Sequence, residues 1–455
     1  MTAWSLRYED GTLVLDGCAE DDIPAGFSWD PRIDRARAPA SAYAALVYLA
    51  RARKIPLEDR VRGYEKLDAL RPLTTRTPRA YQSEAVLAWK AAKNQGVIVL
   101  PTGAGKSFVA ELAILQARRS TLVVVPTLDL LSQWYGNLRR AFGEEGIGAL
   151  GGGSHDIRSI TVATYDSVYI HAGRYGDRFG LVVWDECHHL PAAGYAAAAG
   201  ALIAPFRLGL TATPERPDDG HLAYPKLIGD VVFRKEIPEL AGDFLAPYTT
   251  EVITVSLSDA ERARYDELRA RYKDFLAQNH MSIRSPEDWQ KFIMVASRSK
   301  AGRAAHKAHM ECKRIVQGGE RKLEMVADLL AEEWGRRTIV FTNDNATAMR
   351  ISRALLLPCI THHTDVKERR YWIDAFTKGD VMALVTSRVL NEGVDIPDAE
   401  VAIVVSGSGT VRENVQRLGR ILRPRAGKQA RLYELVAENT GETFTSERRR
   451  DHAAF

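Results

Sequence analysis

Apolar and polar residues alternate along this chain of 455 residues in two distinct ways. Between about residues 75 and 230, short runs of Val, Ile, Leu and Thr end in turn residues and are separated by longer helical stretches. Near-continuous apolar runs of about four to eight residues are typical of strands buried on both faces of a parallel sheet. The runs are GVIVLP, STLVVVP, SITVAT, FGLVVWDE and FRLGLTAT, and after about residue 335 RTIVFTN, MALVTS and VAIVVSGSG. The pattern predicts two α/β domains.

The segments before and between these domains follow other patterns. The N-terminal segment opens with two alternating runs around Asp10 and Gly11, which is a hairpin signal, and residues 41–54 have helical spacing. Residues 263–278 repeat apolar side chains at helical spacing among basic ones, and a second basic stretch follows at 297–314. Such a basic helical face is either simply solvated or, as an insertion between two α/β domains, an element that grips nucleic acid.

The charge and cysteine content exclude several classes of protein. Lys and Arg number 62 against 58 Asp and Glu, so nucleic-acid binding would depend on local clusters of charge. The four cysteines are scattered, which argues against a disulfide framework, a structural zinc site and an iron–sulfur cluster. The N-terminus lacks a signal-peptide pattern, and the longest apolar stretch, 195–206, is too short to span a bilayer. We expect a cytoplasmic protein, nucleoid-associated if prokaryotic, without membrane contact.

A glycine-rich turn joins the first apolar run to the helix that follows it. Its sequence is PTGAGKS, residues 101–107. Between a parallel strand and a helix, such a turn aims backbone N–H groups at an anion and suits a polyphosphate. Gly103 and Gly105 let the backbone approach closely, Lys106 can reach the terminal phosphates, and the Ser107 hydroxyl can bind Mg²⁺. Leu100 stands where this motif has its first glycine.

The run DECHH, residues 185–189, places five polar or metal-binding side chains in succession at the end of another apolar run. A phosphate-binding sheet needs a carboxylate beside Mg²⁺ at this distance along the chain. Asp185 is the expected Mg²⁺ ligand, and Glu186 is expected to orient and deprotonate the attacking water. If the extended conformation continued, Glu186 and His188 would face away from the other three, so the five could not bind one ion. A zinc site is the competing interpretation, and it would need ligands from elsewhere.

Together, PTGAGKS, DECHH, TAT at 211–213 and QRLGRILRP at 416–424 resemble the motifs of superfamily-2 helicases. The sequences around these motifs are most similar to the XPB family, in its short archaeal and bacterial form. The segments that carry this similarity are VVVPTLDLLSQW, ATYDSV, DECHHLPA, APFRLGLTAT and GSGTVRENVQRLGRILRP. The resemblance implies an α/β fold of two RecA-like parallel-sheet domains in tandem, with a small N-terminal α+β domain and a helical thumb-like insertion. The implied domains are 1–72 for damage recognition, 73–232 for ATP binding, 233–318 for the linker and thumb, and 319–455 for the C-terminal helicase domain.

The resemblance also implies roles for single residues. The ATP site would contain Arg79, Gln82, Pro101, Thr102, Gly103, Ala104, Gly105, Lys106, Ser107, Asp185, Glu186, Gly393 and Asp395. Gln416, Arg420 and Arg423 would reach the γ-phosphate from the second α/β domain, so that hydrolysis requires closure. His188, Thr211 and Thr213 would couple the nucleotide to movement. DNA contacts would fall mainly on backbone phosphates, and the candidate residues are Thr127, Thr164, Arg216, Asp218, Arg298, Lys300 and Arg303.

One departure from the family pattern bears on strand separation. The family has an Arg-Glu-Asp triplet associated with strand opening, whereas this chain has Pro217 at the glutamate position, with Glu215 as the nearest substitute. The leading hypothesis is a DNA-dependent ATPase and 3′ to 5′ DNA helicase in repair, a monomer that binds duplex, forked or single-stranded DNA. One alternative is a double-stranded DNA translocase without strand separation, in restriction, defence or remodelling. Another is a nucleotide-latched DNA scaffold that recruits a nuclease. The choice of DNA over RNA rests on the resemblance.

Overall fold

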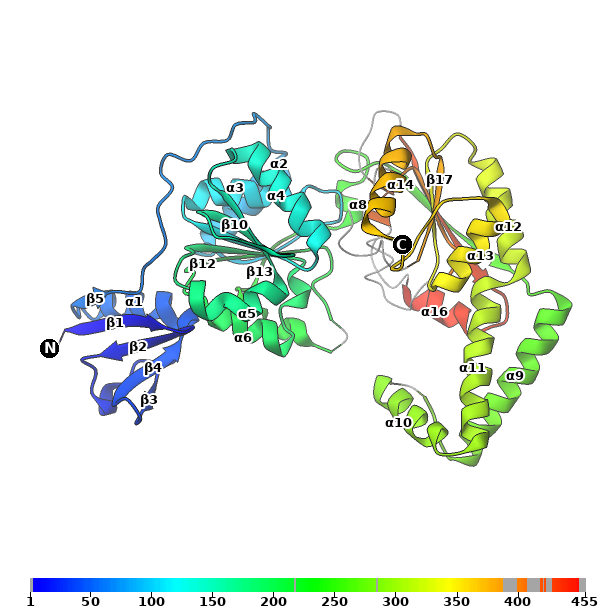
Figure 1. Ribbon diagram of the computed structural model, residues 1–455, viewed down its shortest axis with the longest axis horizontal. Helices are drawn as coiled ribbons and strands as arrows, with labels where there is room; N and C mark the ends of the chain where they lie inside the picture. Colours follow the sequence, from blue (N-terminus) through cyan, green and yellow to red (C-terminus); the bar gives the residue numbers. More distant parts are fainter. Residues whose placement is uncertain are drawn as a thin grey trace. The chain divides into compact units, whose positions relative to one another are not determined.

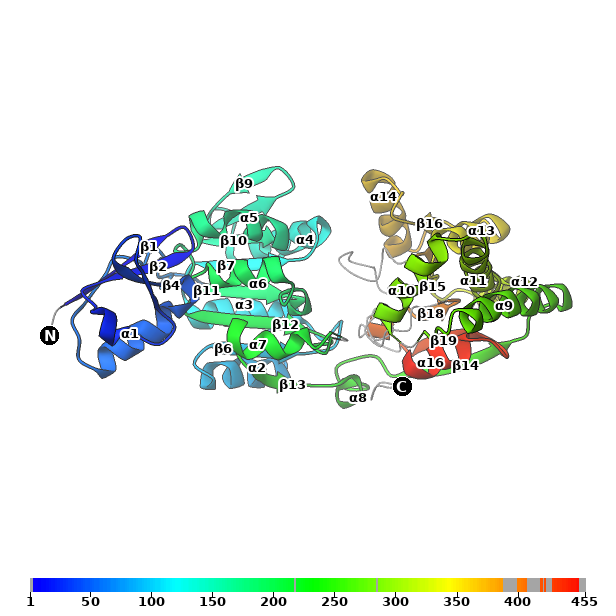
Figure 2. The same cartoon turned by 90° about the horizontal axis from the view of Figure 1, so that it is seen from below.

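The computed structural model describes residues 3–216, 218–283, 285–387, 399–406, 418–419, 421–422 and 428–449 (Figures 1 and 2). The chain divides into two compact units between Glu239 and Leu240. The first unit contains the N-terminal module and one parallel sheet, and the second contains another parallel sheet and a group of long helices. No helix in these ranges is long and apolar enough to cross a bilayer.

The N-terminal module is a five-stranded sheet of order β3-β4-β2-β1-β5 with one α-helix. Its elements are β1 (Trp4–Glu9), β2 (Thr12–Asp16), β3 (Ser28–Asp30), β4 (Arg35–Pro39), α1 (Tyr43–Ala52) and β5 (Leu57–Asp59). Glu9 pairs with Thr12, and the two residues between them, Asp10 and Gly11, have φ of 43° and 82°. These angles suit the two-residue turn that favours a hairpin. The predicted hairpin and helix are therefore confirmed.

The first parallel sheet has the order β13-β6-β12-β11-β7-β10-β8-β9, and only β9 runs antiparallel to its neighbour. The elements are α2 (Ala80–Ala91), β6 (Gln95–Val99), α3 (Lys106–Ala117), β7 (Thr121–Val125), α4 (Leu128–Phe142), β8 (Ile147–Gly151), β9 (Ser154–Asp156), β10 (Ile160–Thr164), α5 (Tyr165–Tyr175), β11 (Leu181–Asp185), α6 (Ala193–Gly200), β12 (Phe206–Thr211), α7 (Tyr224–Leu227), β13 (Val231–Arg234) and α8 (Ile237–Leu240). Helices α2, α3 and α4 cover one face and α5 and α6 the other (Figure 1). Each predicted apolar run of this domain contains one strand of the sheet.

The second unit has a six-stranded sheet of order β14-β19-β18-β15-β17-β16, in which every recorded pair is parallel. Its elements are β14 (Tyr248–Val255), α9 (Asp259–Gln278), α10 (Pro286–Ser297), α11 (Lys300–Gly318), α12 (Glu320–Glu332), β15 (Thr338–Phe341), α13 (Asn345–Leu355), β16 (Cys359–Ile360), α14 (Val366–Lys378), β17 (Ala383–Thr386), β18 (Val401–Val404), β19 (Ala430–Ala437) and α16 (Glu442–Arg449). The expected fold, two tandem parallel-sheet domains with a small N-terminal α+β domain, is confirmed.

The range 233–318 differs from its predicted description as linker and helices. Strand β14 lies inside it and pairs with β19 along all of Tyr248–Val255, so this part of the range belongs to the second sheet. The reason that the pattern hides this strand is its exposure, since only Val255 among its eight side chains is buried. The helical part is as expected: α9, α10 and α11 pack around Phe275, Phe292 and Ala305.

Candidate nucleotide and nucleic-acid site

Predicted site residues gather at one edge of the first sheet. Neighbouring parallel strands β6, β12, β11, β7 and β10 point the same way, so their carboxyl ends meet at that edge, where α/β sheets bind ligands. The phosphate-binding turn follows β6, and Thr211 and Asp185 end β12 and β11. Thr127 lies just beyond β7, and Thr164 ends β10. The fold thus brings together five separate sequence motifs.

The phosphate-binding turn joins β6 to α3, which begins at Lys106. Gly103 and Gly105 have φ of 87° and 81°, a left-handed conformation that glycine adopts without strain. A Cβ on Gly105 would lie 2.6 Å from Gln82 Nε2, so the close approach also requires glycine. The Lys106 ammonium donates to the Leu100 carbonyl oxygen at 3.3 Å. The first N–H groups of α3 and this lysine suit a bound polyphosphate.

Arg79 and Gln82, two of the predicted ATP-site residues, lie at the start of α2. Gln82 is buried, and its Oε1 accepts from the Arg79 N–H at 3.0 Å. Its Nε2 donates to the Ala104 carbonyl oxygen at 3.1 Å, and the Tyr81 hydroxyl donates to the same oxygen at 2.7 Å. The start of α2 is therefore tied directly to the phosphate-binding turn through Ala104.

Asp185 is a buried carboxylate held by several donors. Its Oδ2 accepts from the Trp134 indole N–H at 2.7 Å, and its Oδ1 from the Glu186 N–H at 3.1 Å. The Tyr165 hydroxyl donates to the Asp185 carbonyl oxygen at 3.1 Å. Burial raises the pKa of Asp185, and the neighbouring charge of Glu186 raises it further, while Lys106 opposes both. The carboxylates of Asp185 and Glu186 and the ammonium of Lys106 therefore lie close enough to influence one another.

Glu186 leaves the strand conformation, so residues 185–189 do not alternate as they would in a continuing strand. It has φ of 48° and ψ of 53°, and Cys187–His189 form a short 3-10 turn. The strand ends at Asp185, so the alternation of side chains stops there. The Glu186 Oε2 atom is buried and has no hydrogen-bond partner among the described residues, and it lies 3.4 Å from His188 Nδ1. A buried carboxylate oxygen of this kind suits a role toward bound water.

His188 connects the acidic run to the next strand. Its side chain is fully buried, and its Nδ1 lies 3.2 Å from the Thr211 hydroxyl oxygen. That oxygen also accepts from the Thr213 N–H at 3.2 Å. The three residues predicted to couple nucleotide to movement are therefore in contact. Cys187 packs in the hydrophobic core, and no group of three metal-binding side chains occurs in the described part of the chain.

The residues around the family's Arg-Glu-Asp triplet form ion pairs near the acidic run. The Arg216 guanidinium contacts both carboxylate oxygens of Asp218, at 2.8 and 2.6 Å, and this pairing holds the pKa of Asp218 well below its usual range. Arg216 also donates to the His188 carbonyl oxygen. Glu215, the expected substitute, pairs with Arg234 at 2.6 Å. Arg216 thus contacts both Asp218 and the turn after β11.

The remaining predicted DNA contacts lie in both units. Thr127 and Thr164 are the N-cap residues of α4 and α5, where each side-chain oxygen accepts a backbone N–H. Arg298, Lys300 and Arg303 are exposed at the junction of α10 and α11. The predicted residues Pro217, Gly393, Asp395, Gln416, Arg420 and Arg423 lie outside the described residues.

Three contacts of this site are made by residues that the sequence motifs did not predict as site residues. Tyr81, Trp134 and Tyr165 each place a polar group of a buried aromatic ring on the backbone or side chain of a motif residue. One property of the sequence could have indicated such contacts, because a buried indole or phenol in an amphipathic helix needs a polar partner. The sequence pattern does not identify the partner of each aromatic side chain.

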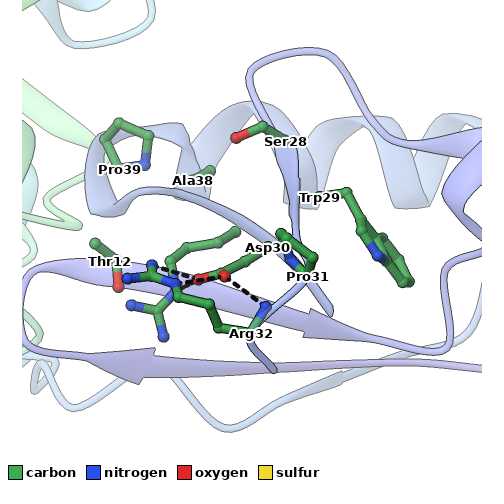
Figure 3. Close-up of a pocket in the computed structure, with 9 residues that line it drawn as sticks. Thr12, Ser28, Trp29, Asp30, Pro31, Arg32, Ala38 and Pro39 are labelled. Atoms are coloured by element: carbon green, nitrogen blue, oxygen red, sulfur yellow. Dashed lines mark hydrogen bonds and ion pairs between the residues drawn. The ribbon is translucent and has the colours of Figure 1, made fainter. Parts of the chain in front are cut away.

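A pocket of about 450 Å³ lies in the N-terminal module (Figure 3). Asp30 is buried there, and Arg32 contacts its two carboxylate oxygens at 2.8 Å each. Arg37 Nε lies 3.6 Å from Asp30 Oδ2. Two guanidinium groups therefore converge on one carboxylate, and they hold its pKa below the usual range. These pairs fix the turn between β3 and β4.

The fold and this site define a P-loop nucleotide-binding protein of the tandem parallel-sheet helicase type. The crystal structure of the Pyrococcus furiosus Hef helicase domain shares the fold, with a TM-score of 0.55 and 21% identity over 82% of this chain and 98% of that one. Residues 6–61 match the Xeroderma pigmentosum group B helicase damage recognition domain. Residues 75–216 match the type III restriction enzyme res subunit, and 320–453 match the ERCC3/RAD25/XPB C-terminal helicase.

Whole-chain relatives agree with these matches. The DNA 3′-5′ translocase XPB2 of Sulfurisphaera tokodaii is 40% identical over 98% of this chain and 99% of its own length. The DNA 3′-5′ helicase XPB of Kineococcus radiotolerans is 34% identical over 80% of this chain and 60% of its own. An Arabidopsis thaliana XPB1 subunit of general transcription and DNA repair factor IIH is 24% identical over 82% of this chain and 48% of its own. The chain belongs to the XPB family of helicases.

Proposed function

We propose that this chain is a DNA-dependent ATPase that moves along DNA in the 3′ to 5′ direction and acts in DNA repair. The observation that carries the proposal is the acidic pair at the carboxyl end of β11 on the same sheet edge as the phosphate-binding turn. The direction and the DNA substrate come from two relatives, a DNA 3′-5′ translocase and a DNA 3′-5′ helicase. Cytoplasmic location and a monomeric state are part of the same proposal.

The described residues fit ATP with Mg²⁺. Left-handed Gly103 and Gly105 open the turn to phosphate, and Lys106 lies at the helix start that faces it. Ser107 and Asp185 would hold the Mg²⁺ that accompanies the nucleotide, since a hydroxyl and a carboxylate are oxygen ligands. The Mg²⁺ would supply charge stabilisation at the phosphates.

Glu186 is the proposed base toward the attacking water. Its Oε2 atom is buried beside His188 and accepts no hydrogen bond from the described residues, so it is available to orient a water molecule. His188, Thr211 and Thr213 would pass a change at Glu186 to the end of β12. Gln416, Arg420 and Arg423, with Gly393 and Asp395, are proposed from the resemblance to complete the site from the second α/β domain.

Replacing Glu186 by Gln tests this assignment. The change preserves the size of the side chain and removes the base, so nucleotide binding should persist while DNA-stimulated hydrolysis falls by about a hundredfold or more. Phosphate release would be measured beside equilibrium binding of a fluorescent ATP analogue. Glu144→Gln is the matched control, because Glu144 is an exposed acid paired with Arg139. Wild-type turnover in Glu186→Gln would remove Glu186 from this role.

Translocation without strand separation is the second candidate activity. It is favoured by Pro217 in the triplet position and by the mutual pairing of Arg216 and Asp218, which already engages both charges. A forked-duplex unwinding assay beside a triplex-displacement assay separates the two activities. Displacement of the third strand without unwinding identifies a double-stranded DNA translocase, and unwinding of the fork identifies a helicase.

We also propose DNA contacts in the thumb and elsewhere, functional domain divisions, and a role for a partner protein. Arg298, Lys300 and Arg303 would contact DNA phosphates, as would Thr127, Thr164 and Arg216. Asp218 is a further candidate DNA contact, through groups other than phosphate. The domain ranges 1–72, 73–232 and 319–455 are proposed as functional divisions, with the thumb between them. A nuclease partner belongs to the alternative function, a nucleotide-latched DNA scaffold. That alternative becomes the leading proposal if no nucleic acid stimulates ATP hydrolysis.

A further inference from the structure

Two buried aromatic side chains contact Asp185 from helices on opposite faces of the first sheet. Trp134 comes from α4, and its indole N–H donates to Asp185 Oδ2 at 2.7 Å. Tyr165 comes from α5, and its hydroxyl donates to the Asp185 carbonyl oxygen at 3.1 Å. Helices α4 and α5 cover different faces of the sheet (Figure 1). Asp185 is thus held by one helix from each side.

Trp134 fixes the plane of the Asp185 carboxylate. Trp134 is 2% exposed and lies on the buried side of α4 with Leu131 and Leu138. An indole N–H can only donate, and a bond to a carboxylate is stronger than one between neutral groups. Because the Glu186 N–H occupies the other oxygen, each carboxylate oxygen has a donor of its own. Loss of the indole N–H would free one oxygen and let the carboxylate rotate.

Tyr165 fixes the backbone where β11 ends. Its ring is buried and packs against Trp184, with the ring centres 5.6 Å apart. Its hydroxyl holds the carbonyl of Asp185 immediately before Glu186, which turns into the left-handed conformation. This bond therefore sets the direction in which the chain carries Glu186 away from the strand.

Both helices begin at candidate DNA contacts. Thr164 is the N-cap of α5 and immediately precedes Tyr165. Thr127 is the N-cap of α4, and Trp134 lies about two turns further along the same helix. A helix moves as a stiff body, so a displacement at either N-cap would also move the donor that holds Asp185.

We propose that Trp134 and Tyr165 are positioning residues that set the Asp185 carboxylate and link it to the starts of α4 and α5. DNA held at these helix starts would thereby change how well Asp185 is placed toward the metal. The proposal rests on the proposed function, since it assumes that Asp185 holds a metal and that DNA binds near Thr127 and Thr164. Neither aromatic residue touches the reacting atoms.

Trp134→Phe and Tyr165→Phe test the proposal, because each removes one donor and keeps an aromatic ring. The matched control for the first is Trp89→Phe, since Trp89 is a buried tryptophan of the same domain whose indole donates to the Arg207 carbonyl oxygen at 2.9 Å. The control for the second is Tyr43→Phe, which removes the hydroxyl that contacts Asp59 in the N-terminal module.

Two quantities would be measured on the full chain. The first is the affinity for Mn²⁺ in the presence of a non-hydrolysable ATP analogue, followed by electron paramagnetic resonance. Trp134→Phe should weaken it about tenfold, the lower end of the effect of removing a residue that orients a metal ligand. The second is the ratio of DNA-stimulated to basal hydrolysis, which should fall in Trp134→Phe and in Tyr165→Phe. Both quantities should stay at wild-type values in the two controls.

The outcomes separate a positioning role from simple packing. Equal Mn²⁺ affinity and equal stimulation in Trp134→Phe and Trp89→Phe would overturn the proposal for Trp134. Equal stimulation in Tyr165→Phe and Tyr43→Phe would overturn it for Tyr165. If the wild-type chain shows no DNA-stimulated hydrolysis, the proposed function fails, whereas the Mn²⁺ affinities still decide whether Trp134 positions Asp185.

Discussion

Arg207 is a buried cation whose acceptors are backbone carbonyl oxygens. The guanidinium donates to the carbonyls of Ala199, Leu202, Ala204 and Leu227, at 2.7 to 3.2 Å. Burial lowers the pKa of Arg207 to about 10, so the side chain stays charged at neutral pH. These bonds tie the end of α6 and the end of α7 to β12, the strand that leads to Thr211.

Replacing Arg207 by Met should destabilise the first unit by about 3 kcal/mol or more, because four carbonyl groups lose a buried donor. Arg53→Met is the control, since Arg53 is half-exposed and pairs with the exposed Asp22. Its expected effect is below about 1 kcal/mol. Urea unfolding followed by tryptophan fluorescence would compare the two variants. Similar midpoints would show that the carbonyl cluster contributes little.

For single residues, the sequence predicted which motif residues lie together at the sheet edge, but not the hydrogen bonds and backbone angles that fix their positions. The turn at residues 101–107 and the acidic run could be located because their residue types and spacing are specific. The left-handed conformation of Glu186 carries no signal in the pattern, since glutamate rarely adopts it. The bond from Trp134 to Asp185 joins residues 51 apart and depends on packing across the sheet.

Among the elements, the thumb helices contain a histidine whose charge should affect their stability. His309 on α11 lies between the rings of Tyr272 and Trp289, at 4.6 and 4.9 Å between centres. Burial lowers the pKa of His309 from 6.5 to about 4, and the nearby charges of Lys313 and His306 act in the same direction. The folded thumb therefore resists protonation of this ring.

The stability of the thumb should fall as pH decreases from about 6.5 to about 4, because only the unfolded state takes up the proton in that window. His309 is partly exposed, so we discount the shift for screening and expect a loss of about 1 to 2 kcal/mol. Hydrogen exchange of α9–α11 at pH 7 and pH 5 would measure it. His309→Phe should reduce the dependence, whereas His280→Asn, which removes an exposed histidine of the same region, should not. Equal dependence in both variants would contradict the assignment.

Strand prediction depended on a continuous apolar run and not on burial alone, since β8 and β19 are mostly buried but were not predicted, and neither was the mostly exposed β14. The eight apolar runs all became parallel strands because side chains on both faces are covered, which leaves a clear pattern. Strand β14 presents mostly exposed side chains, and its partner β19 lies far along the chain. Pairing between distant segments is set by the assembled sheet, so a local pattern does not contain it.

Across the whole molecule, the N-terminal module is joined to the first parallel sheet by specific contacts as well as by the chain. The Tyr8 hydroxyl donates to the carbonyl oxygens of Ala172 and Ala201, at 2.8 and 3.0 Å. A Cβ added to Gly11 would lie 2.7 Å from Ala201 Cβ, so the hairpin turn sits directly against α6. The module and the nucleotide-binding sheet therefore form one unit.

The second unit offers a test of how its sheet is completed. A fragment that begins at Leu240 keeps β14, whereas one that begins at Ser256 lacks it and leaves β19 at the edge. We expect the longer fragment to elute as a monomer in size-exclusion chromatography and the shorter one to form aggregates. Identical monomeric elution of both fragments would contradict this expectation.

The pairing of β14 with β19 also changes what the chain between the two units does. All eight residues of Tyr248–Val255 are paired with β19 in parallel register, so the connecting chain caps the sheet that it leads into. An open strand edge is a template on which other chains can add strands. During synthesis β14 emerges long before β19, so its own backbone stays unpaired until the last strand of the sheet is made. The chain must therefore keep β14 soluble through most of the synthesis of the second unit, and its exposed polar side chains, Thr249, Thr250, Glu251 and Thr254, serve that need.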